Sequence, residues 1–298
     1  MDKQIPLSDS ARADENEHDG IHEVLVDLAY QRLMLVNVAF AGRANAGDRG
    51  WALIDAGLPG TAPLIRSAAE ERFGKGARPA AIIMTHGHFD HTGALERLSE
   101  EWDTPIYAHR QELPYLDGTS SYPPPDPTVG GMMATVSPLF PRDPIDVSAR
   151  LFALPDDGGV PGMPGWRWIS TPGHTEGHVS LWRESDRALV SGDAVITTRQ
   201  ESAYAVAMQS PEMHGPPAYF TPDWNAAEQS VRRLAALEPA LIVPGHGRAF
   251  AGPEMRSALH ALAERFADVA VPKHGRYVDG VGRGGDHKPD LPEIDGSR

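Results

Sequence analysis

The sequence predicts an α/β fold in which two β-sheets lie face to face between outer helices, a four-layer α/β/β/α sandwich. Strand and helix patterns alternate up to about residue 109, an all-strand stretch follows from about 166 to 193, and a second helix–strand–helix run extends from about 223 to 267. Several strand patterns end at a histidine or an aspartate. Two similar strand–helix halves around such loops favour the four-layer architecture.

The first half of the chain contains clear strand and helix patterns. Residues 21–40 hold two aliphatic clusters that predict two neighbouring strands, and the next apolar segment predicts a strand that ends at Asp55. A helix is expected from Thr61 to about Phe73, with a proline in its first turn and a glycine after its last. The apolar run at 80–84 indicates a buried strand. Its carboxyl end delivers Thr-His-Gly-His-Phe-Asp-His, in the position where α/β proteins commonly place their sites.

The later elements lie on either side of a long irregular insertion. Eight prolines fall between residues 111 and 144, and we interpret 111–150 as a lid-like insertion with a short apolar helix. The other predicted elements are a helix at 93–101, a strand at 105–109, three strands between 166 and 193, an irregular segment at 199–222, a helix at 223–237, a strand at 240–243 and a last helix at 253–267.

The ordered part of the chain is predicted to be one domain, from residue 21 to 270. Residues 1–20 are polar and acidic, lack the apolar core of a signal peptide, and are expected to be a disordered lead-in. Residues 271–298 are rich in glycine and charge and are expected to be a mobile tail. No stretch approaches the ~18 apolar residues that a membrane-spanning helix needs, so we expect a soluble, cytoplasmic protein that does not bind membranes.

The composition excludes several classes of site. The sequence has no cysteine, which excludes disulfide scaffolds, thiolate zinc sites, iron–sulfur clusters and cysteine nucleophiles. Its 27 Lys and Arg against 41 Asp and Glu give a formal charge of −14, the wrong sign for binding a nucleic-acid backbone. We therefore expect a small-molecule substrate and no nucleic-acid partner, and any metal site must use histidines and carboxylates.

Four potential metal ligands fall within six residues of the motif His-Gly-His-Phe-Asp-His: His86, His88, Asp90 and His91. Histidine nitrogen and aspartate oxygen suit zinc and other first-row divalent ions. The adjacent side chains of Asp90 and His91 diverge and do not readily serve the same ion as His86 and His88. Two ions are therefore predicted.

Three further residues follow strand patterns and have small or turn-forming neighbours. They are His174 in Thr-Pro-Gly-His-Thr, Asp193 in Ser-Gly-Asp-Ala, and His246 in Pro-Gly-His-Gly. Glycine and proline fix a tight turn and let a ligand approach the backbone closely. The repeated local design predicts that all three belong to the same metal site.

These residues resemble those of the metallo-β-lactamase superfamily, whose His-x-His-x-Asp-His motif is matched by the first four. The downstream order His, Asp, His is matched at intervals of 174 − 88 = 86, 193 − 174 = 19 and 246 − 193 = 53 residues. The resemblance implies the α/β/β/α fold and support for the site from Asp55. It also implies a ligand set: His86, His88 and His174 for one ion, Asp90, His91 and His246 for the other, and Asp193 as the bridge.

The resemblance further implies a hydrolase that uses a metal-bridging hydroxide, because two cations lower the pKa of a bridging water and stabilise an oxyanion. Zinc is the first choice of metal, and manganese, iron, cobalt and nickel are alternatives. The motif Thr-Pro-Gly-His-Thr-x-Gly-His and the bridging aspartate are similar to those of glyoxalase II-like and lactonase-like enzymes. A small ester, lactone or thioester is the predicted substrate, and Asp90 is also predicted to accept a proton.

Other functions stay open at this point. An iron-dependent oxidoreductase like the sulfur dioxygenases, a β-lactam or phosphoester hydrolase, and a metal-free binding protein are the alternatives. The oligomeric state is open too, with a homodimer as one alternative.

Several further side chains are weaker candidates. His178 is a candidate to support the ligands from behind, with an ordinary structural role as its alternative. Any one of four tyrosines in the irregular segments is a candidate hydrogen-bond donor to substrate: Tyr115, Tyr122, Tyr204 and Tyr219. Four apolar residues are candidates for lining a pocket: Met132, Met133, Leu139 and Phe140. Four histidines without companion ligands are interpreted as surface residues: His214, His260, His274 and His287.

Overall fold

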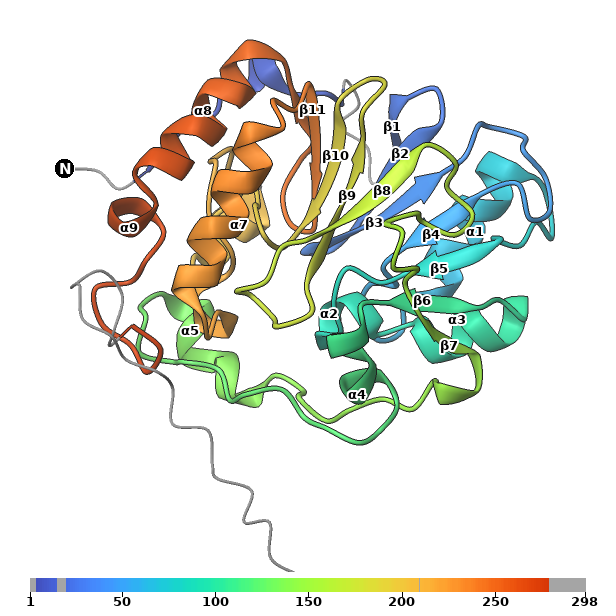
Figure 1. The fold of residues 1–298 in the computed structure, drawn as a ribbon, viewed down its shortest axis with the longest axis horizontal. Coiled ribbons are helices and arrows are strands. Elements are labelled where there is room, and N and C mark those ends of the chain that lie inside the picture. Colours follow the sequence, from blue (N-terminus) through green and yellow to red (C-terminus); the bar gives the residue numbers. More distant parts are fainter. Residues whose placement is uncertain (1–3, 15–19, 209, 279–298) are drawn as a thin grey trace, which may run out of the picture.

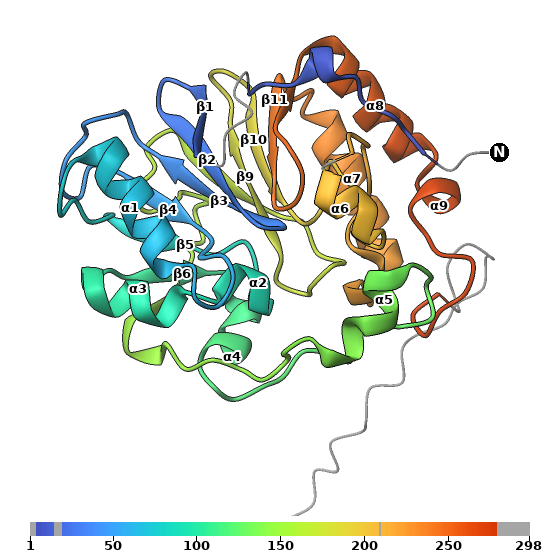
Figure 2. The ribbon, with the colours of Figure 1, turned by 180° about the vertical axis from the view of Figure 1, so that it is seen from behind.

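The computed structural model describes residues 4–14, 20–208 and 210–278, and in it two β-sheets lie face to face between two layers of helices (Figure 1). The helices α1 and α3 cover one outer face, and α7 and α8 cover the opposite one, as the view from behind also shows (Figure 2). This arrangement confirms the predicted α/β/β/α sandwich. The helices are α1 (Ala62–Phe73), α2 (Phe89–Thr92), α3 (Leu95–Trp102), α4 (Leu113–Leu116), α5 (Met132–Val136), α6 (Ala203–Met208), α7 (Trp224–Ala236), α8 (Gly252–Glu264) and α9 (Phe266–Val269).

The first sheet has seven strands in sequence order, antiparallel from β1 to β4 and parallel from β4 to β7. Residues 21–40 form most of three strands, where the sequence predicted two. Met34 adopts the left-handed conformation, with φ 62°, and reverses the chain inside what reads as one apolar run. The strands are β1 (Ile21–Leu25), β2 (Leu28–Leu33), β3 (Val36–Ala41), β4 (Ala52–Ile54), β5 (Ala81–Ile83), β6 (Ile106–Ala108) and β7 (Leu151–Ala153).

The second sheet has five strands in the order β12-β11-β10-β9-β8, and only β10 and β11 pair in parallel. Alternate residues of a strand point to opposite faces, and the packing follows this rule. In β10, Val190 lies in the core between the sheets, whereas its neighbour Leu189 packs against the helices. The strands are β8 (Trp166–Ser170), β9 (Val179–Arg183), β10 (Ala188–Gly192), β11 (Leu241–Pro244) and β12 (Phe250–Ala251).

Part of the predicted disordered lead-in is folded instead. Ile5 and Leu7 are buried in the core beneath α8, and the carbonyl of Ile5 accepts a hydrogen bond from the backbone nitrogen of Met213 at 2.8 Å. Burial of these two apolar side chains stabilises the folded segment. The mostly polar composition of residues 1–20 gave no indication of it. Residues 1–3 and 15–19 lie outside the described part of the chain.

The tail predicted to be mobile also begins with an ordered stretch. Tyr277 donates a hydrogen bond from its hydroxyl to the carbonyl of Pro124 at 2.6 Å, and Arg276 contacts the same loop. Residues 271–278 therefore pack on the lid-like insertion, and the rest of the predicted tail, 279–298, lies outside the described residues.

One of the histidines interpreted as a surface residue is buried. His214 has 7% exposure and lies with its Nε2 3.8 Å from a carboxylate oxygen of Glu201. His214 lies within the irregular segment at 199–222, which packs against the core, and the local sequence gives no sign of this packing. His287 lies outside the described residues.

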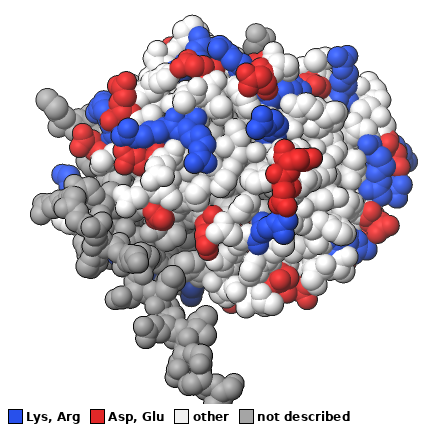
Figure 3. Space-filling model, viewed as in Figure 1, with Lys and Arg blue, Asp and Glu red and all other residues white. Residues whose placement is uncertain are grey.

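The surface has mixed charge on the face drawn in Figure 3, where Lys and Arg side chains lie among Asp and Glu side chains. Among the helices of the described ranges, none has the length and apolar character needed to cross a membrane.

Candidate metal centre

Four strand ends bring the seven predicted ligands to one place between the two sheets. The first four ligands follow β5 and continue into α2, and His174 lies in the loop between β8 and β9. Asp193 follows β10 and His246 follows β11. Every one of the seven side chains is buried, and they form three overlapping clusters: His86, His88 and His174; His86, His91 and Asp193; Asp90, His91 and His246.

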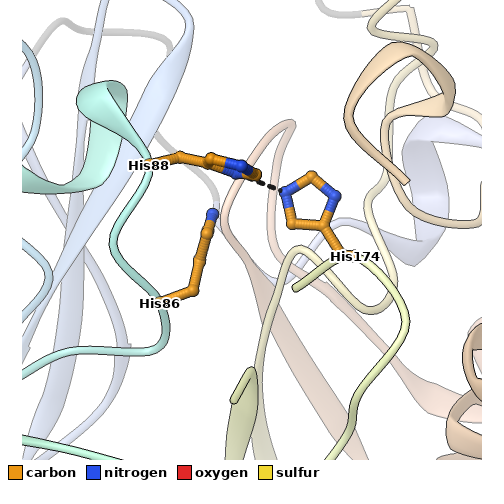
Figure 4. Close-up of side chains that lie close together, drawn as sticks. All are labelled: His86, His88 and His174. Atoms are coloured by element: carbon orange, nitrogen blue, oxygen red, sulfur yellow. Dashed lines mark hydrogen bonds between the residues drawn. The ribbon is translucent and has the colours of Figure 1, made fainter. Parts of the chain in front are cut away.

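The first cluster contains three histidines whose rings converge. Figure 4 shows His86 and His88, from the loop after β5, facing His174 from the other half of the molecule. His88 Nδ1 and His174 Nε2 are 2.9 Å apart, and the rings of His86 and His88 are 4.8 Å apart. Burial lowers the pKa of His88 to about 3 and holds the pKa of the other two well below the ordinary value. All three rings are therefore neutral and offer lone pairs.

Asp193 lies between the first cluster and the ligands around His246. Its Oδ2 is 3.4 Å from His174 Nε2 and 3.1 Å from His246 Nε2, and its Oδ1 is 3.4 Å from His91 Nε2. Burial opposes ionisation of Asp193, but the neighbouring His246 and His91 hold its pKa well below the usual value. Asp90 completes this side of the site, with Oδ2 3.5 Å from His246 Nε2, and burial raises its pKa.

Within the described residues, three buried polar atoms at the centre lack a hydrogen-bond partner: His86 Nε2, His91 Nε2 and Asp193 Oδ1. A buried polar atom without a partner costs about 1–3 kcal/mol, so three gathered in one place require a compensating group. Two imidazole nitrogens and a carboxylate oxygen are good donors to a divalent cation. The cluster therefore fits divalent metal ions.

Buried side chains behind the ligands fix the orientation of their rings. Asp55 Oδ2 accepts a hydrogen bond from His91 Nδ1 at 2.8 Å, which leaves His91 Nε2 directed at the centre. The same oxygen accepts the hydroxyl of Thr85 at 2.8 Å, and the Thr85 oxygen lies 3.1 Å from His86 Nδ1. Asp55 thus supports ligands of two clusters, which is the position that the resemblance predicts for it.

His178 supports the predicted bridge. Its Nε2 accepts a hydrogen bond from the backbone nitrogen of Asp193 at 3.0 Å, and its Nδ1 lies 2.8 Å from the hydroxyl of Thr171. Burial lowers the pKa of His178 to about 4, so the ring stays neutral and can accept that bond.

Some supporting groups were absent from the sequence predictions. The carbonyl of Leu35 accepts a hydrogen bond from His246 Nδ1 at 2.6 Å, and Thr221 Oγ1 is 3.4 Å from His174 Nδ1. Thr85 could have been suspected as a supporting residue, because it directly precedes His86 in the sequence. Leu35 and Thr221 lie 211 and 47 positions from their partners, so no local pattern marks them.

Comparison with known sequences decides the family. Residues 35–246, more than half of the chain, match the sequence model of the metallo-beta-lactamase superfamily. The chain belongs to this superfamily.

Relatives within the superfamily carry hydrolase names. Over 251 residues the chain is 47% identical to the probable metallo-hydrolase YflN of Bacillus subtilis (strain 168), a match that covers 84% of this chain and 92% of the relative. The probable metallo-hydrolase YybB of the same organism is 32% identical over 170 residues, covering 57% and 64%. The Rm3 metallo-beta-lactamase shares the fold, with a TM-score of 0.57, 19% identity and coverage of 88% and 97%. The chain is therefore a metal-dependent hydrolase, the enzyme class predicted from its sequence.

A cavity of about 160 Å³ lies beside two of the seven predicted ligands, His88 and His174. Aromatic rings and prolines make up most of its wall, and Lys and Arg are absent from the described residues that line it. The remaining lining residues are Tyr115, Tyr122, Pro123, Pro124, Thr175, Glu176, Phe220, Pro222 and Tyr277.

The four candidate tyrosines occupy different positions. Tyr115 lines the small cavity, and the hydroxyl of Tyr122 donates to Glu112. Tyr204 is 73% exposed and lines a separate cavity of about 730 Å³ between α5, α6 and residues 269–274, which none of the seven ligands lines. Tyr219 is buried, and burial, with Asp90 nearby, holds its pKa well above the usual value.

The four apolar candidates do not line the cavity beside the ligands. Met132 lines the larger cavity, and Leu139 is 83% exposed. Met133 and Phe140 pack against Tyr219 and its neighbour. Met133 and Phe140 are therefore part of the hydrophobic packing around that cluster.

Proposed function

We propose that this chain is a dinuclear metal-dependent hydrolase that acts on a small ester, lactone or thioester. The observation that carries the proposal is the set of seven buried predicted ligands, with three atoms at its centre that lack a hydrogen-bond partner in the described residues. His86, His88 and His174 would hold one ion, and Asp90, His91 and His246 the other. Asp193 is suited to bridge them because its two oxygens face ligands of both groups.

Two divalent ions, with zinc as the first choice, would supply Lewis acidity and a water of lowered pKa. The chain contributes proton acceptors and donors around them. Asp90 is also the proposed proton acceptor, because its carboxylate lies among the predicted ligands with Oδ2 3.5 Å from His246 Nε2. Tyr219 is buried near Asp90, and its hydroxyl, which is protonated at neutral pH, is the proposed hydrogen-bond donor to a substrate oxygen.

The cavity beside His88 and His174 favours an uncharged substrate. Its described lining offers aromatic and proline surfaces and one carboxylate, that of Glu176, but no Lys or Arg to pair with an anion. The formal charge of −14 also disfavours an anionic substrate, because like charges repel. An uncharged lactone or ester is therefore favoured over a phosphoester, a nucleic acid or a β-lactam that carries a carboxylate.

The test combines elemental analysis of the purified protein with hydrolysis assays on a neutral lactone, an aryl ester, a thioester, a cephalosporin and a phosphodiester. We expect about two metal ions per chain, and hydrolysis of the uncharged acyl compounds that a chelator abolishes. His88→Ala should lose metal and activity, whereas His260→Ala, a matched change at a partly exposed histidine, should lose neither. Iron as the bound metal, without hydrolysis of any compound, would instead support oxidative chemistry on this fold.

A further inference from the structure

Glu112 is a fully buried carboxylate that is not one of the seven predicted ligands. It ends the short 3-10 turn Arg110–Glu112, within the lid-like insertion, and its exposure is 0%. Burial raises the pKa of its carboxyl group. A carboxylate removed from water is unfavourable unless hydrogen bonds replace its hydration, so this position requires a compensating environment.

That environment consists of four hydrogen-bond donors. Oε1 accepts the hydroxyl of Thr175 at 2.6 Å and the backbone nitrogen of Gly177 at 3.0 Å. Oε2 accepts the backbone nitrogen of Gly87 at 3.0 Å and the hydroxyl of Tyr122. Both oxygens are therefore satisfied by neutral groups, and the described structure gives Glu112 no salt bridge.

The donors come from both loops that carry the first histidine cluster. Gly87 is the residue between His86 and His88, in the loop after β5 of the first sheet. Thr175 directly follows His174, in the loop between β8 and β9 of the second sheet. One side chain thus joins the two halves of the sandwich next to the histidines that face each other across them.

The local sequence leaves room for this contact. A Cβ atom on Gly177 would lie 2.8 Å from Glu112 Cγ, and a Cβ atom on Gly87 would lie 2.7 Å from the Tyr122 hydroxyl oxygen. Neither glycine has the positive φ that would itself demand glycine. The close approach of Glu112 and Tyr122 is therefore what excludes a side chain at these two positions.

We propose that Glu112 is a positioning residue that sets the distance between the two loops, so that His86, His88 and His174 are held ready for one metal ion. Ordering the two loops that carry these histidines has an entropic cost. Four hydrogen bonds to one rigidly buried carboxylate supply that order before the ion binds. The inference rests on the proposed metal centre but not on any particular substrate.

The same network reaches the substrate side. Tyr122 donates to Glu112, and its ring lies 4.4 Å from the ring of His88, between centroids, in the wall of the small cavity. Glu112 therefore fixes the position of Tyr122 in the cavity wall relative to the loop that carries His86 and His88.

The experiment measures zinc affinity of the full chain by competition with a chromophoric chelator, using zinc alone. In Glu112→Gln, an amide NH₂ group replaces one of the two accepting oxygens, so two donors of the surrounding loops lose their acceptor. One of the two zinc equivalents should bind about 10-fold to 100-fold more weakly, the range for loss of a group behind metal ligands. It should be the equivalent that His88→Ala removes. Asp156→Asn, at an exposed carboxylate that pairs with Arg110, should bind both ions like the wild type.

A milder pair of variants covers the case in which Glu112→Gln fails to fold. Thr175→Val removes one donor and should weaken the same zinc equivalent several-fold, whereas Thr175→Ser keeps the hydroxyl and should restore wild-type affinity. Equal affinities in Thr175→Val and Thr175→Ser, or equal weakening of both ions in Glu112→Gln, would overturn the positioning role. A wild-type protein that binds no zinc or other divalent ion would overturn the metal centre itself, which is a different result from normal binding without hydrolysis.

Discussion

Replacing Asp55 by asparagine should weaken the second metal site without changing the backbone. Asp55 adopts φ 59°, a left-handed conformation that asparagine tolerates well and alanine does not. Its Oδ1 accepts the backbone nitrogen of Thr85 at 2.8 Å. Its Oδ2 accepts both the Thr85 hydroxyl and His91 Nδ1, each at 2.8 Å. Asparagine can place its one oxygen at only one of these positions, so at least one buried donor loses its acceptor.

The size of the effect follows from that loss. A buried donor without an acceptor lowers the free energy of unfolding by about 1–3 kcal/mol. If His91 is the donor affected, its ring is free to turn, and zinc affinity at its site should fall about 10-fold to 100-fold. That range corresponds to about 1.4–2.8 kcal/mol of binding free energy.

Urea unfolding of the metal-free protein and zinc competition of the loaded protein would measure the two quantities. Asp156→Asn is the matched control, because that exposed carboxylate pairs with Arg110 at the surface. It should change neither quantity. Wild-type zinc affinity together with wild-type stability in Asp55→Asn would refute the reasoning that the Asp55 carboxylate orients His91.

Three other outcomes can be checked with the same protein. Changing His88 or His246 to alanine should each remove about one metal equivalent and most hydrolytic activity, and unchanged metal content in both would contradict the ligand assignment. Tyr219→Phe should lower kcat/KM by about 10²-fold with metal content unchanged, as for a lost oxyanion donor, and wild-type kinetics would exclude Tyr219 from substrate binding. Because the pKa of His178 is lowered from 6.5 to about 4, the unfolded chain binds a proton that the folded protein does not between those pH values. Wild-type stability should therefore fall by about 3 kcal/mol from that group as pH drops from 6.5 to 4, and His178→Gln should lack this part of the slope in urea titrations.

The sandwich fold could be predicted because its signals are local. Apolar runs that end at glycine, proline and a ligand mark β5, β10 and β11, and the helix expected from Thr61 to Phe73 corresponds to α1 (Ala62–Phe73). The turn at Met34 escaped prediction because it interrupts an apolar run without glycine or proline. Ile5 and Leu7 escaped it because two apolar residues in a polar segment form no periodic pattern.

The seven predicted ligands were selected from the sequence, together with Asp55 and His178 behind them, whereas Leu35, Thr221 and Glu112 were not. Each of the seven histidines and aspartates lies just after a predicted strand, and four of them fall within six residues. Residue type and position were therefore enough to select all seven predicted ligands. Glu112 reads locally as one more acidic residue in a proline-rich insertion. Only in the folded chain does its carboxylate meet four donors from three segments.

Periodicity and residue type are properties of neighbouring residues, so they predict the layer architecture and a site made of histidines and carboxylates. The ring orientations, the position of Asp193 between the clusters, and the contact of Glu112 with loops of both sheets appear only in the folded chain. The hydrogen bonds from Gly87 and Gly177 to Glu112 join residues 25 and 65 positions apart, and the bond from His246 to Leu35 joins residues 211 positions apart. Their geometry depends on the path of the whole folded chain.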